Sequence, residues 1–185
     1  MHRLFVAARP PPAIRTLLTA VMGGVRGARW QSDDQIHLTL RFIGEVDRHR
    51  AEDVHAALGA IHHPAFELAV SGLGTFERRR RPEVIWAGVS PHAPLKALHK
   101  KIDQAIARVG VEPDRRTYFP HITLARLDRG AGALGSFLAR RVATETFTVD
   151  GFTLFESRLT PQGPVYSTLE RYRLDDASRR STSDA

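Results

Sequence analysis

One short motif occurs twice in this chain and constrains its fold more than any other feature. The tetrapeptide His37-Leu38-Thr39-Leu40 returns, after nearly half the chain, as His121-Ile122-Thr123-Leu124. With 9 His among 185 residues, random order gives roughly 0.1 His-x-Thr-x motifs in which both variable positions are apolar. Two copies therefore indicate an internal duplication, in which two similar halves each contribute one histidine.

Both copies show the alternation that is typical of a half-buried β-strand. Side chains on a strand point to opposite faces in turn, so His37, Thr39 and Arg41 are predicted on one face and their apolar neighbours on the other. His121 and Thr123 are predicted to share a face in the same way. Arg126 has the opposite parity and is expected where its strand ends.

The rest of the chain alternates between strand and helix patterns. Helices are predicted where apolar residues recur at helical spacing after a proline or a capping aspartate, over residues 10–22, 47–61 and 94–109. Strands are predicted over residues 3–9, 36–43, 66–76, 84–89, 121–125, 145–156 and 165–173. This order predicts an α+β fold in which two similar lobes face each other across a cleft. We assign residues 1–175 to this single bilobal domain and expect the polar tail, residues 176–185, to be unstructured.

Composition narrows the function classes less than the motif does. The formal net charge of +7 indicates an acidic partner, nucleic acid first, yet 24 of the 27 basic residues are Arg, a bias that genome composition alone can produce. The absence of Cys excludes disulfides and thiolate metal sites. No stretch is long enough to span a bilayer, so a soluble, cytoplasmic protein is expected.

Together these residues resemble the two-histidine (2H) phosphoesterase superfamily, and within it the RNA 2′,3′-cyclic phosphodiesterases, historically called 2′-5′ RNA ligases. The likeness extends over nearly the whole chain. The segments that carry it are Arg3–Ala7, His37–Glu45, Arg81–Val89, Phe119–Arg126, Leu154–Leu159 and Tyr166–Tyr172.

The resemblance implies a bilobal fold with pseudo-twofold symmetry and an active cleft between two antiparallel sheets. It also implies hydrolysis of an RNA terminal 2′,3′-cyclic phosphate to a 2′-phosphate, with no metal and no cofactor. By this likeness His37 is the proton donor to the 3′-oxygen and His121 is the proton acceptor from water. The expected partner is RNA with a cyclic phosphate end, including tRNA fragments for some members, and a monomer is expected.

Four further side chains are assigned to the substrate phosphate. Thr39 and Thr123 are expected to donate hydrogen bonds to its non-bridging oxygens, and Arg126 and Arg41 to add electrostatic stabilisation.

Several alternatives stay open at this stage. The chain is also compatible with a 2′-5′ RNA ligase, a phosphodiesterase for small cyclic nucleotides, or a noncatalytic nucleotide- or RNA-binding protein. The Arg78–Arg81 loop is either a solvated hairpin tip or a site that attracts an RNA backbone. Tyr118 and Phe119 either stack on a base or pack in the core. His62-His63 lacks a carboxylate or Cys framework, so no metal site is predicted there.

Overall fold

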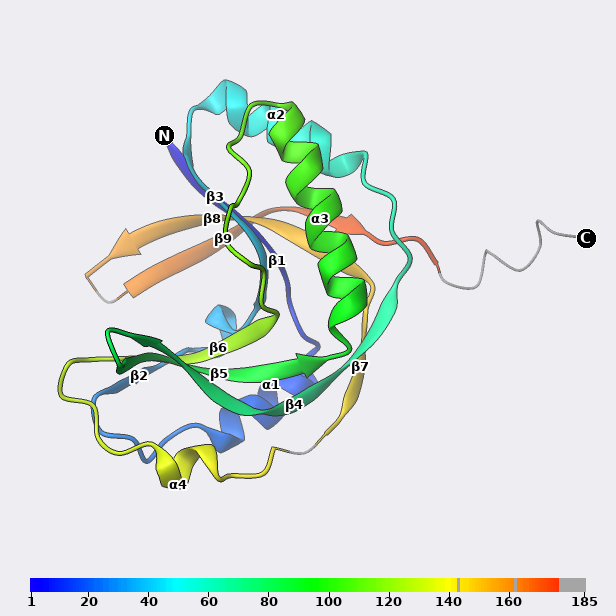
Figure 1. Cartoon of the computed structure of the whole chain (residues 1–185). Helices are drawn as coiled ribbons and strands as arrows, with labels where there is room; N and C mark the ends of the chain where they lie inside the picture. The colour runs from blue at the N-terminus through cyan, green and yellow to red at the C-terminus, as the bar shows by residue number, and fades with distance from the viewer. Residues whose placement is uncertain (143, 162, 177–185) are drawn as a thin grey trace, which may run out of the picture.

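A single curled antiparallel sheet organises the protein, and helices cover its outer side (Figure 1). The computed structural model describes residues 1–142, 144–161 and 163–176. The α+β class is confirmed. Of the tail predicted over 176–185, only Asp176 is among the described residues.

The strands are β1 (His2–Ala8), β2 (Ala28–Trp30), β3 (Leu38–Val46), β4 (Phe66–Arg78), β5 (Arg81–Ser90), β6 (His121–Leu127), β7 (Thr146–Val149), β8 (Gly151–Thr160) and β9 (Gly163–Arg173). The helices are α1 (Pro12–Val21), α2 (Arg48–Gly59), α3 (His92–Arg108) and α4 (Gly135–Leu138), with a 3-10 turn η1 over Asp33–Gln35. Among the described residues, no helix is long and apolar enough to cross a membrane.

The duplication is visible in the strand order β7-β4-β5-β6-β3-β1-β8-β9, with β2 attached to β6. The series β1-α1-β3-α2-β4 has its counterpart in β5-α3-β6-α4-β8. The last strand of each series crosses over: β4 pairs with β5, and β8 pairs with β1. We call the sheet region β3-β1-β8-β9 the His37 half and the region β6-β5-β4-β7 the His121 half. The two predicted lobes therefore share one sheet, joined through the pair Leu38 and Ile122.

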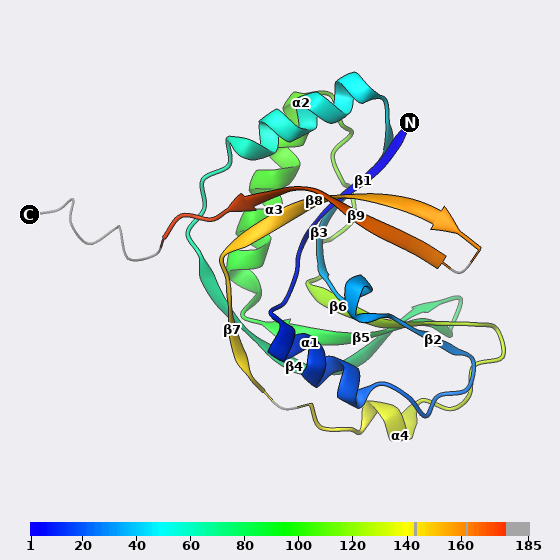
Figure 2. The same ribbon diagram turned by 180° about the vertical axis from the view of Figure 1, so that it is seen from behind.

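Helices shield the two halves from opposite ends of the molecule. Helices α2 and α3 lie over the outside of the His37 half, and α1 and α4 lie under the His121 half (Figures 1 and 2). The stripe that predicted the third helix is buried as expected, because Leu95, Leu98, Ile102 and Ile106 are all inaccessible to solvent. Burial of each such side chain contributes about 1.5–3 kcal/mol. The predicted cap of α2 is also confirmed: the Asp47 carboxylate accepts a hydrogen bond from the backbone N–H of Arg50.

A β-bulge interrupts each histidine strand at the same place in its motif. On β3, Thr39 pairs with Ala7 and Arg41 pairs with Val6, which leaves Leu40 without a partner on β1. The same irregularity on β6 leaves Leu124 unpaired opposite β5. A bulge inserts one extra residue, so the side chains beyond it exchange faces.

This exchange corrects two expectations about the arginines. Arg41 does not share a face with His37, because the bulge turns it toward α3, where only 6% of its side chain is exposed. Phe42 takes its place on the concave side of the sheet and is 52% exposed. On β6 the corresponding exchange brings Arg126 onto the face of His121.

Candidate active site

Sheet register brings the two histidines and two threonines of the motifs together. Leu38 and Ile122 are antiparallel partners, so the adjacent positions set His37 opposite Thr123 and Thr39 opposite His121. Residues directly opposite each other have Cβ atoms about 4.5–5.5 Å apart. The four side chains therefore form a compact array on the concave face, around the pseudo-twofold axis of the duplication.

Each imidazole is held by the same local device. The Nδ1 of His37 lies 2.7 Å from the carbonyl oxygen of Gln35, and the Nδ1 of His121 lies 2.8 Å from that of Phe119. In both cases the acceptor is two residues earlier in the chain. A carbonyl only accepts, so Nδ1 carries the proton and Nε2 of the neutral ring is the nitrogen that can take one up.

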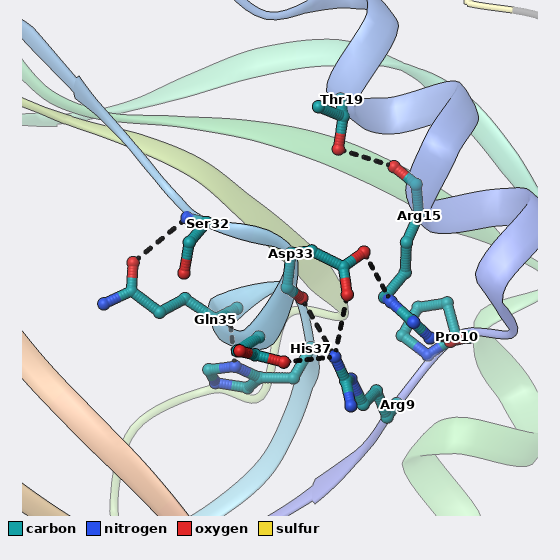
Figure 3. A network of polar contacts seen from close by, with 9 residues as sticks. Arg9, Pro10, Arg15, Thr19, Ser32, Asp33, Gln35 and His37 are labelled. Carbon is teal, nitrogen blue, oxygen red and sulfur yellow. Dashed lines mark hydrogen bonds and ion pairs between the residues drawn. The ribbon is translucent and has the colours of Figure 1, made fainter.

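The carbonyl that orients His37 belongs to the η1 turn, which two arginines hold in place, one just after β1 and one on α1 (Figure 3). Arg15 Nε donates to Asp33 Oδ1 at 2.8 Å, and Arg9 Nη2 donates to Asp33 Oδ2 at 3.0 Å. Hydrogen bonding to Arg15 keeps the pKa of the Asp33 carboxyl below its usual value. The side chain of Gln35 closes the turn by accepting from the backbone N–H of Ser32.

Burial makes both imidazoles poor bases. Desolvation is the main reason that the pKa of His37 falls to about 4, and the charges of His121, Arg126 and Arg9 act in the same direction. Burial also lowers the pKa of His121. Both rings are therefore mainly neutral at pH 7, and a bound anion would raise their pKa values.

Aromatic walls account for this desolvation. The ring of His37 lies 5.1 Å from Phe5 and 5.3 Å from Tyr166, while that of His121 meets the edge of Phe76 at 4.7 Å. Such walls limit the access of water and strengthen electrostatic interactions inside the site.

A pocket of about 220 Å³ opens beside the second imidazole. Tyr118 forms part of its wall: its ring stacks on His99 at 4.1 Å, and its hydroxyl donates to the Thr39 carbonyl at 3.2 Å. His99 in turn lies 2.7 Å from the carbonyl of the bulge residue Leu40. Tyr118 is thus a packed side chain, whereas Phe119 is 42% exposed at the pocket.

Arg41, which was predicted to contact the substrate phosphate, is bound within the protein instead. Its Nε forms an ion pair with Asp103 Oδ1 at 2.6 Å, and its two Nη atoms donate to the carbonyls of Phe42 and Glu112. All three nitrogens are therefore engaged within the protein, and Arg41 fastens the bulged strand to α3.

Arg126 is placed differently and has a neighbour that sequence reasoning missed. Arg29 on β2 is its register partner, and both side chains are exposed. Within residues 1–142, 144–161 and 163–176, neither arginine has a carboxylate within ion-pair distance. Like charges directly opposite each other destabilise a strand pair, so this pair is suited to an anion. A three-residue strand gives no pattern from which Arg29 could have been found.

Among the residues that the structure describes, no group of three or more His, Asp or Glu side chains is arranged to hold a metal ion. His62 is exposed and lies 3.4 Å from Asp175.

Solved structures of other proteins share this fold. TT0787 of Thermus thermophilus superimposes with a TM-score of 0.80 at 28% identity, covering 95% of this chain and 99% of that one. The E. coli LigT structure complexed with 3′-AMP gives a TM-score of 0.76 at 28% identity, covering 94% and 98%. A curled antiparallel sheet flanked by helices, with two His-x-Thr strands meeting at its centre, is the fold of the two-histidine phosphoesterases.

The sequence then identifies the family. The model of the 2′-5′ RNA ligase superfamily matches residues 10–160, and the chain belongs to that superfamily. A relative from Aeropyrum pernix, named RNA 2′,3′-cyclic phosphodiesterase, is 34% identical over 80% of this chain and 86% of its own length. The resemblance drawn from the motifs is confirmed.

Proposed function

We propose that this protein opens the terminal 2′,3′-cyclic phosphate of RNA to leave a 2′-phosphate, with two histidines as acid and base and without a metal ion. The observation that carries the proposal is the pair of matched imidazoles, His37 and His121, each with Nδ1 fixed by a carbonyl and Nε2 left for proton transfer. Relatives named for this activity, from Aeropyrum pernix to Thermotoga maritima, support the choice of substrate.

In the proposed reaction His121 Nε2 takes a proton from water as the water oxygen bonds to phosphorus. The bond from phosphorus to the 3′-oxygen breaks, and that oxygen receives a proton from His37 Nε2. The hydroxyls of Thr39 and Thr123 donate to the non-bridging oxygens, and Arg126 balances the added negative charge.

The proposed donor must carry a proton, yet burial holds the pKa of His37 well below its usual value. The substrate corrects this. A phosphate that neutralises Arg126 removes one of the charges that lower the pKa of His37, whereas the shift of His121 comes from burial. Bound phosphate therefore favours the protonated form of His37.

A second candidate activity, 2′-5′ ligation, follows from the same geometry when the 5′-hydroxyl of another RNA replaces water. His121 Nε2 would take the proton of that hydroxyl as its oxygen bonds to phosphorus, the bond from phosphorus to the 3′-oxygen would break, and His37 Nε2 would protonate the 3′-oxygen, which leaves a 2′-5′ linkage. We also propose that the protein acts as a monomer and that tRNA fragments are among its substrates.

The test is an oligonucleotide with a 2′,3′-cyclic phosphate, incubated with the protein in EDTA. Ring opening to a 2′-phosphate is expected, with strong losses in His37→Ala and His121→Ala and none in His49→Ala, an exposed histidine on α2. A 3′-phosphate product, or full turnover in either active-site variant, would contradict the proposal. Salt-dependent RNA binding with no turnover would show a binding protein instead, and a strong preference for cyclic mononucleotides would exclude RNA as the substrate.

A further inference from the structure

The tip of the β4–β5 hairpin is built from residues that its backbone disfavours. The strands predicted over residues 66–76 and 84–89 extend further than expected: β4 continues to Arg78 and β5 begins at Arg81, so that only Arg79 and Arg80 form the turn. These two residues have φ values of 51° and 60°. Two-residue hairpin turns with positive φ at both positions strongly prefer Asn-Gly, since other side chains are strained there. Turn stability does not explain the arginines.

Electrostatics within the fold does not explain them either. Arg78 and Arg81 are register partners, which sets two like charges directly opposite each other. Together with Arg79 and Arg129 they line a hollow between the hairpin tip and the segment after β6, where the carboxylates are Glu83 and Asp128. Within the described ranges of the chain, none of these four arginines lies within ion-pair distance of a carboxylate. Elsewhere on the surface, arginines such as Arg15 and Arg171 are paired.

The hairpin leads directly away from the active site. Phe76 contacts the ring of His121, and Arg78 is two residues further along the same strand and thus on the same face. Two residues of a strand span about 7 Å. Arg126 is the register partner of Val84 on the neighbouring strand. Cationic groups therefore extend from the histidine and threonine side chains of the active site to the tip of the β4–β5 hairpin.

We propose that Arg78–Arg81 and Arg129, named here the arginine hairpin, bind the phosphodiester backbone of the substrate on the 5′ side of its cyclic end. This inference rests on the proposed function, because a cyclic phosphate terminates the 3′ end of the RNA, and the RNA continues from it only in the 5′ direction. Guanidinium groups match phosphate oxygens in geometry and charge. The arginine hairpin makes an oligonucleotide a better substrate than a cyclic mononucleotide.

The hairpin offers a variant that separates binding from folding. In Arg79→Asn/Arg80→Gly the turn receives its preferred residues, so Tm is expected to rise or stay unchanged while two charges are lost. A second variant, Arg78→Ala/Arg81→Ala, removes the facing pair. The control Lys96→Ala/Lys100→Ala removes the same charge from exposed positions on α3.

Steady-state kinetics are compared on a cyclic-phosphate-ended oligonucleotide and on a 2′,3′-cyclic mononucleotide. Each hairpin variant is expected to raise KM for the oligonucleotide about tenfold, because one or two charge-assisted hydrogen bonds are removed. KM for the mononucleotide should stay unchanged in the hairpin variants, and the control variant should keep the wild-type KM for both substrates. The dependence of log KM on log salt should weaken by about 0.7 for each phosphate of the single strand that the variant no longer binds.

Unchanged KM for the oligonucleotide in both hairpin variants, with ring opening intact, would overturn the arginine hairpin proposal and leave the proposed function standing. If the wild-type protein opens the cyclic phosphate of neither the oligonucleotide nor the mononucleotide, the proposed function fails. Fluorescence anisotropy with a 3′-phosphorylated oligonucleotide then tests the arginine hairpin separately. Weaker binding in the hairpin variants supports the inference. Equal binding by the variants, or equally tight binding of a poly-glutamate peptide of the same length, overturns it.

Discussion

The His37 half and the His121 half share a frame but differ in what surrounds it. Each has a histidine oriented by a carbonyl two residues earlier, a threonine, and a bulge at the following leucine. After the bulge the halves diverge: Arg41 and Phe42 in one correspond to Ala125 and Arg126 in the other. The two halves thus share the device that orients each imidazole and differ in the environment of each ring.

This divergence is the physical basis for the different roles that we propose for the two histidines. His37 lies among aromatic rings and close to the charge of Arg126, whereas His121 borders an open pocket. Environments that move two pKa values apart divide acid from base in a catalytic pair. Variants in each half test that division.

Removal of either histidine should cost most. His37→Ala and His121→Ala are each expected to lower kcat on a cyclic phosphate by about 10²–10⁴-fold, the usual contribution of a positioned acid or base. A 4-nitrophenyl nucleotide diester, whose leaving group needs no proton, should restore much of the rate to His37→Ala only. Restoration in His121→Ala instead would reverse the assigned roles.

Arg41 tests the half that carries a buried charge. Arg41→Met should lower the free energy of unfolding by about 3 kcal/mol, because Asp103 then keeps a largely buried, unpaired charge. Denaturant unfolding measures this loss, and the double variant Arg41→Met/Asp103→Leu should recover part of it. KM of the folded protein should change little, and a large rise in KM would return Arg41 to the phosphate site.

The threonines test the symmetry that remains. Thr39→Val and Thr123→Val keep the shape and remove a hydroxyl, and each should reduce kcat about 10²-fold, as loss of one transition-state donor does. Similar losses would show that both halves hold the phosphate. A loss confined to one variant would mean that only one half does so.

The pH profile tests the asymmetry between the imidazoles. Activity that requires one protonated and one neutral ring is greatest between their two pKa values, so kcat/KM should peak below pH 6.5, since burial lowers both. In Arg126→Gln a charge that lowers the pKa of His37 is lost, and the acid limb should move to higher pH. Arg29→Gln should move that limb less, and an acid limb that stays fixed in Arg126→Gln would contradict this account.

Most helices and strands and the two site histidines could be predicted from the sequence, because both depend on local patterns. Alternation identified the two strands, and helical spacing located α1, α2 and α3 within a few residues. The same patterns do not predict the two β-bulges. Leu40 is apolar and buried, so the alternation of polar and apolar residues continues through it. Nothing in the spacing shows that Arg41 and Arg126 each lie on the opposite face of the strand from the one predicted.

Long-range and backbone contributions were also beyond the sequence. The carbonyls of Gln35 and Phe119 orient the imidazoles, but a carbonyl belongs to every residue and carries no sequence signal. Arg29 reaches the site only through the pairing of β2 with β6, a contact between distant segments.

The exchange of β4 and β8 has a consequence for the autonomy of the two series. A fragment that ends at Arg78 contains β1 without its neighbour β8, and β4 without its neighbour β5. Its counterpart lacks the complementary edges and carries the other histidine. Two such pieces are expected to be inert apart and to regain ring opening on mixing, so that enzymatic rescue would report directly on their reassembly.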